Sequence, residues 1–79
     1  MIHTFDKYRV ANAFLWGAKN GYKEFCRNVV YNYAQVYYTP ARDVLAAISV
    51  MLLGPEGFEY EEYRKVKKML EELMEETKL

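Results

Sequence analysis

One stretch of the sequence is apolar at almost every position, and it limits the folds open to the chain. Of the ten residues from Val44 to Leu53, only Ser49 is polar. Thr39 and Pro40 precede the stretch in the order that begins a helix, a capping hydroxyl and then a proline at the first helical position. The stretch is too short for a membrane span, which needs about 20 residues. Because a helix that is apolar on all sides is normally buried, we expect a helix at about 40–53 in the centre of a core.

The residues before this stretch predict an amphipathic helix at about 6–19. Thr4 or Asp6 is its expected N-cap, and Asn20-Gly21 is a stop signal because glycine tolerates the left-handed conformation after a helix end. At about 100° per residue, the apolar residues gather on one face. This face consists of Val10, Ala11, Phe14, Leu15 and Ala18.

The segment at about 22–38 is the most ambiguous, because it is rich in valine and tyrosine, which favour strands. Helical spacing places its apolar residues in a single stripe. The stripe consists of Tyr22, Phe25, Cys26, Val29, Val30, Tyr33, Val36 and Tyr37. An alternating strand pattern leaves the pair Phe25-Cys26 unexplained. We therefore expect a helix here, with a strand at 28–38 as the alternative.

The last predicted helix, at about 58–77, follows a turn formed by Gly54-Pro55-Glu56-Gly57. Its first turn is acidic, which suits the positive end of the helix dipole. Its apolar residues repeat at spacings of three and four and form a packing seam. The seam consists of Tyr63, Val66, Leu70 and Leu73. It is too short to establish a coiled coil, so it serves either to dock this helix on the others or to form a homodimer.

The four segments together predict an all-α protein, a compact four-helix domain that includes residues 1–79 and packs around the apolar third helix. Cys26 is the only cysteine, so no intramolecular disulfide can form, and this indicates a reducing compartment. The first residues do not follow the pattern of a secretory signal. We therefore expect a cytoplasmic protein without a membrane partner.

The residues that metal binding and catalysis require are scarce in this chain. It has one cysteine and one histidine, His3, which do not suffice for a cluster of nitrogen and sulfur ligands. Catalysis by Cys26 would need a base, and nothing in the sequence brings the only histidine near it; Cys26 lies on an apolar stripe, as a structural cysteine does. The turn at 54–57 lacks the lysine of a phosphate-binding loop. We expect no metal, no cofactor and no enzymatic activity.

Aromatic and charged residues are unevenly distributed, and this distribution indicates where a partner binds. Residues 1–38 hold ten of the thirteen aromatic residues and carry a charge of +3, whereas residues 39–79 carry −3. Tryptophan, tyrosine and arginine dominate the hot spots of protein interfaces. On the polar faces of the first two helices, the candidates are Trp16, Arg27, Tyr31, Gln35 and Tyr38. We expect a small adaptor, regulator or inhibitor that binds another protein through them, although the pattern places Trp16 equally well in the core.

Two other functions fit parts of the sequence. The short Asn20-Gly21 turn joins the first two helices as in a helix-turn-helix unit, and the second helix would then contact DNA. The candidates for nucleic-acid contact are Lys19, Lys23, Arg27 and Asn28. The zero net charge argues against this function, because phosphate neutralisation supplies most of the non-specific affinity. The other function is that of a homo-oligomeric structural protein, which associates through Tyr63, Val66, Leu70 and Leu73.

Overall fold

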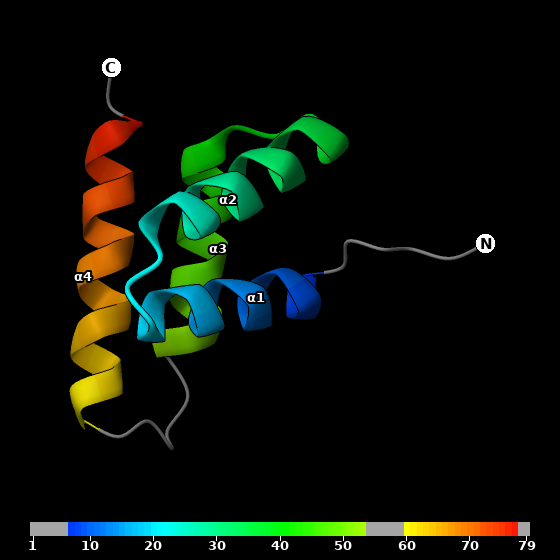
Figure 1. Ribbon diagram of the computed structural model, residues 1–79. Helices are drawn as coiled ribbons and strands as arrows, with labels where there is room; N and C mark the ends of the chain where they lie inside the picture. Colours follow the sequence, from blue (N-terminus) through cyan, green and yellow to red (C-terminus); the bar gives the residue numbers. More distant parts are fainter. Residues whose placement is uncertain (1–6, 54–59, 78–79) are drawn as a thin grey trace.

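Four helices arranged as two antiparallel pairs make up the fold. The structure is a computed structural model that describes residues 7–53 and 60–77. Its described residues form α1 (Lys7–Lys19), α2 (Lys23–Tyr37), α3 (Ala41–Leu53) and α4 (Tyr60–Glu76), with no strand. The α1–α2 pair crosses α3, and α4 stands beside α3 (Figure 1). The predicted all-α, four-helix fold is confirmed.

The helix boundaries agree with the sequence to within two residues. α3 begins at Ala41 rather than at Pro40, because the carbonyl of Pro40 accepts the first helical hydrogen bond, from the amide of Val44 at 3.2 Å. Pro40 thus precedes the first helical position by one residue. The predicted caps at Thr4 and Asp6 and the turn at 54–57 lie outside the described residues.

The connection between α1 and α2 follows from Asn20-Gly21, as predicted. Gly21 has a φ of +76°, a conformation that costs glycine little because it lacks a Cβ. The amide of Tyr22 donates to the carbonyl of Gly17 at 2.8 Å, and the amide of Gly21 donates to that of Ala18 at 3.2 Å. This pair of bonds is the Schellman motif, which satisfies the last carbonyls of a helix. The tight turn brings α2 back along α1.

The segment that sequence alone left between helix and strand is the helix α2. Cys26 and Val30, which are four residues apart, are both buried, whereas Tyr31 is exposed. This is the spacing of one helix face. α2 ends at Tyr37, and its C-cap, Tyr38, adopts the left-handed conformation with a φ of 54° and donates its amide to the carbonyl of Ala34. A residue with a side chain rarely adopts this conformation.

α3 contacts the other three helices, as its apolar sequence predicts, but it is not buried on all sides. Val44, Leu45, Ile48 and Leu52 lie in the core, whereas Val50 is 72% exposed and the neighbouring alanines 46 and 47 are also exposed. The reason is geometric: only three helices pack on α3, and they leave its outer face uncovered. The apolar run therefore overstated how deeply this helix is buried.

The core lies where the two helix pairs meet. Its members in the described part of the chain carry apolar side chains and come from all four helices. They are Val10, Ala11, Phe14, Ala18, Cys26, Val30, Val44, Leu45, Ile48, Leu52, Val66, Met69, Leu70 and Leu73. No described helix is long and apolar enough to cross a membrane.

Candidate functional site

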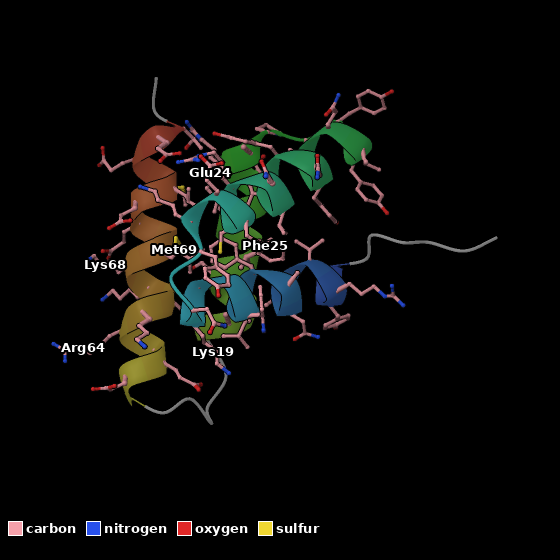
Figure 2. All side chains as sticks on the ribbon, viewed as in Figure 1. Lys19, Glu24, Phe25, Arg64, Lys68 and Met69 are labelled. Atoms are coloured by element: carbon pink, nitrogen blue, oxygen red, sulfur yellow. The ribbon has the colours of Figure 1, made fainter. Side chains whose placement is uncertain are left out.

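Three aromatic side chains form a cluster on the outside of the α1–α2 pair. Trp16 comes from α1, Phe25 comes from α2, and Tyr22 immediately precedes α2. The ring of Trp16 meets those of Tyr22 and Phe25 edge-on, with the ring centroids 5.3 Å apart in both cases. The exposed fractions are 52% for Trp16, 50% for Tyr22 and 39% for Phe25. We call these three residues the aromatic cluster; Figure 2 shows Phe25 between the two helices.

Gly17 allows the two helices that carry the cluster to approach closely. A Cβ at Gly17 would lie 2.7 Å from Cδ2 of Phe25 and 2.8 Å from Sγ of Cys26, which is closer than carbon and sulfur atoms pack. The side-chain amide of Asn20 donates to the carbonyl of Trp16 at 2.8 Å and fixes the end of α1. The aromatic cluster therefore lies on two helices that pack closely together.

The aromatic cluster differs from the set of residues that the sequence suggested. Trp16 lies on the surface, which answers the question that its position in the sequence left open. Tyr22 and Phe25 were expected to face inward, but they are exposed. The predicted apolar stripe of α2 spans eight residues, more than one contact with the core can cover, and only Cys26 and Val30 are fully buried. The length of this apolar stripe was the feature of the sequence that could have indicated exposed aromatic residues on this part of the chain.

The other predicted interface residues of α2 lie on a different side of that helix. Tyr31, Gln35 and Tyr38 are exposed, and Tyr38 is 95% exposed. Tyr31 lies about 120° around α2 from Phe25 at 3.6 residues per turn. It borders Leu73 and Thr77, at the side where α2 meets α4. The predicted surface is therefore two separate regions, one around Trp16 and one around Tyr31.

Arg27, another predicted interface residue, is held within the domain. Its Nε donates to Oε1 of Glu76 and its Nη2 to Oε2, both at 2.9 Å, and its Nη1 lies 2.9 Å from Glu24. Such two-pronged bonds between a guanidinium and a carboxylate are among the strongest polar contacts in proteins. They lower the pKa of Glu76 from 4.5 to about 2 and raise that of Arg27 above its ordinary value. A partner would have to displace Glu76 to reach this guanidinium.

The lysines proposed for nucleic-acid contact also have carboxylate partners. Nζ of Lys19 lies 3.4 Å from Glu62, and Nζ of Lys23 lies 3.5 Å from Glu72 and 3.3 Å from Glu76. All three glutamates belong to α4. The positive charge of the first half of the sequence thus faces the negative charge of the last helix. Of the four proposed nucleic-acid residues, Asn28 alone is exposed without a carboxylate among the described residues.

The seam on α4 is used inside the domain. Val66, Leu70 and Leu73 are buried in the core, and Tyr63 is half-buried. Of the two roles that the sequence allowed, docking on the other helices is the one that these three residues perform. A second copy of the chain would not meet them unless the domain opened.

Cys26 occupies a buried position between α1 and α2. Its Sγ donates to the carbonyl of Phe14 at 3.5 Å, and burial raises the pKa of the thiol from 9.0 to about 11. The group is therefore a protonated thiol at neutral pH, a poor nucleophile. Among the described residues, no group of three or more histidine, cysteine and acidic side chains is placed to hold a metal ion.

Comparisons with known protein families, with curated proteins and with solved structures found no match to this chain.

Proposed function

We propose that this protein is a binding module that occupies a surface of another protein, as an adaptor, regulator or inhibitor, through the aromatic cluster. The observation that carries the proposal is the contact among three exposed rings, Trp16, Tyr22 and Phe25. Aromatic side chains are enriched in the energetically important centres of interfaces because they offer a large, rigid contact area. Rings that are already ordered lose little entropy when a partner binds.

The exposure and backbone conformation of Tyr38 indicate a second contact region outside the aromatic cluster. It is almost fully exposed, and its left-handed backbone costs roughly 1–2 kcal/mol relative to glycine. A strained residue with no packing role is often kept for function. We propose that Tyr38, with Tyr31 and Gln35, forms a second contact for the same kind of partner.

DNA binding through α2 has less support than protein binding. Lys19, Lys23 and Arg27 each lie within 3.5 Å of a glutamate, so their charges are largely compensated before any phosphate arrives. In addition, α1 and α2 run antiparallel side by side, so the partner helix α1 covers one flank of α2 (Figure 1). A recognition helix needs to enter a major groove about 12 Å wide, and α1 at the flank of α2 stands in the way of such an entry.

Site-specific cross-linking tests the proposal. The photoreactive residue p-benzoylphenylalanine replaces Tyr22 or Phe25 in the cluster, Tyr31 in the second region, or Val50 on the exposed face of α3 as a control. We expect positions 22 and 25 to capture the same protein in the cells that make this chain, and position 50 not to capture it. Equal capture from all four positions, or capture from position 50 alone, would contradict the proposal.

A further inference from the structure

A cleft between the α1–α2 turn and α4 collects lysines from three helices. It is an open hollow of about 450 Å³. The side chains of Ala18 and Met69, both members of the core, form its apolar floor. Four lysines surround it: Lys19 at the end of α1, Lys23 at the start of α2, and Lys65 and Lys68 on α4. We call it the lysine cleft; Figure 2 labels Lys19 at the end of α1 and Lys68 on α4.

The charge of the lysine cleft is positive even after its ion pairs are considered. Glu72 is the one carboxylate that lines it, and it pairs with Lys23. From outside the lining, Glu62 pairs with Lys19, and Glu76 pairs with Lys23 as well as with Arg27. Lys65 and Lys68 make no ion pair with any described residue, and they occupy the same face of α4 because they are three positions apart. A concave site with charge of one sign concentrates ligands of the opposite sign.

We propose that the lysine cleft binds a small ligand with several phosphate groups, such as an oligophosphate or the phosphate end of a nucleotide. Lysine is a common phosphate ligand and acts as a point charge. Lys65 and Lys68 supply positive charge that no ion pair with a described residue compensates, and Lys19 and Lys23 lie across the cleft from them, so the cleft favours an anion with several charges in a small volume. The cavity lies within the range of about 300–1,000 Å³ that small-molecule sites occupy. Duplex DNA would need cations spread along its backbone instead.

This site was not visible in the sequence. Residues 39–79 carry a net negative charge, and the lysines of α4 lie among glutamates. In the structure, Glu62, Glu72 and Glu76 turn toward the cations of α1 and α2. Lys65 and Lys68 are left at the edge of the cleft as a result. The proposal does not depend on the aromatic cluster, whose rings do not line the cleft.

Titration of the whole protein with tripolyphosphate, followed by NMR of the backbone amides, tests the site. We expect saturable binding of one ligand, with shifts that centre on Asn20, Gly21, Lys65 and Lys68. Lys65→Gln and Lys68→Gln should each weaken binding about fivefold, because each variant loses the attraction between two unit charges about 4 Å apart in water. Glu72→Gln should strengthen binding by a similar factor, because it removes the carboxylate that lines the cleft, one of the two that pair with Lys23.

Lys67→Gln is the matched control, because it removes the same charge from the same exposed helix but from a residue that does not line the cleft. We expect it to weaken binding less than twofold. Equal losses for Lys67→Gln and Lys68→Gln would reveal diffuse attraction to a charged surface and overturn the proposal. Failure to saturate, or weaker binding by Glu72→Gln, would also overturn it. So would binding of a short oligonucleotide without binding of tripolyphosphate.

Discussion

At the scale of single residues, Gly17 is needed for the close contact between α1 and α2. A methyl group there would press on Sγ of Cys26, which is buried and cannot move aside. Phe25, the other neighbour, is partly exposed and has room to turn. Glycine therefore belongs in the middle of α1 for a packing reason, although it is a poor helix former.

Gly17→Ala should consequently destabilise the protein. Overpacking lowers the free energy of unfolding by about 1–3 kcal/mol, and the better helix propensity of alanine offsets about 1 kcal/mol of that loss. Urea unfolding measures the difference. In a Cys26→Ala background the added methyl group has space, so we expect Gly17→Ala to cost about 1 kcal/mol less there. Equal costs in both backgrounds would show that the sulfur atom is not the obstacle.

Tyr38 provides a second prediction at this scale. Tyr38→Gly should raise the free energy of unfolding by up to about 1 kcal/mol, because glycine relieves a left-handed strain of roughly 1–2 kcal/mol and loses somewhat more entropy on folding. The melting temperature should rise by roughly 4–8 °C per kcal/mol in a domain of this size. Tyr38→Ala removes the ring but keeps the strained backbone, so it should not stabilise the protein. A Tyr38→Gly variant less stable than Tyr38→Ala would show that the strain is absent.

At the scale of helices, ion pairs connect the α1–α2 pair to α4. The ion pairs of Lys19 and Lys23 are about 40% exposed, and such pairs contribute roughly 0–1 kcal/mol each. Arg27 and Glu76 make a two-pronged bond, which is stronger and more specific. This contact joins α2 to α4, two helices that otherwise touch little.

The pKa of Glu76 makes this contact dependent on pH. The carboxylate has a pKa of about 2 when folded and 4.5 ordinarily, so its contribution to stability is complete above pH 4.5 and is lost as the pH falls toward 2. As the pH falls through this range, the free energy of unfolding should therefore decrease more for the wild-type protein than for Glu76→Gln. Thermal melts at several pH values measure the difference in melting temperature between the two proteins, and this difference is the gap that should change. A gap that does not change with pH would contradict the folded pKa.

The sequence predicted the helices well and their surroundings less well. Capping and stop signals such as Asn20-Gly21 act locally, so α1 to α4 could be found to within two residues. Which side of a helix is covered depends on the neighbours it meets. Val50 is apolar but exposed, because none of the described helices packs on that side of α3. Likewise, the partner of Arg27 is Glu76, 49 positions away, and no local pattern specifies such a pair.

At the scale of the whole molecule, the docking of α4 decides which groups face solvent. Its glutamates pair with Lys19, Lys23 and Arg27, whereas the rings of Trp16 and Tyr22 remain exposed on the α1–α2 pair. The sequence pattern grouped Trp16 with Arg27 and Tyr31, but residues on the polar faces of two helices need not lie on one side of the folded protein. Lys65 and Lys68, which make no ion pair with a described residue, lie on α4 at the edge of the lysine cleft.

We propose the aromatic cluster as the contact surface for a protein partner. The most direct test is the dissociation constant of the partner captured by cross-linking, measured by calorimetry with Trp16→Ala and with the exposed control Val50→Ala. Truncation of a hot-spot tryptophan costs about 2 kcal/mol or more, so the dissociation constant should rise about 30-fold for Trp16→Ala and stay unchanged for Val50→Ala. An unchanged dissociation constant for Trp16→Ala, in a variant that remains folded, would contradict the claim.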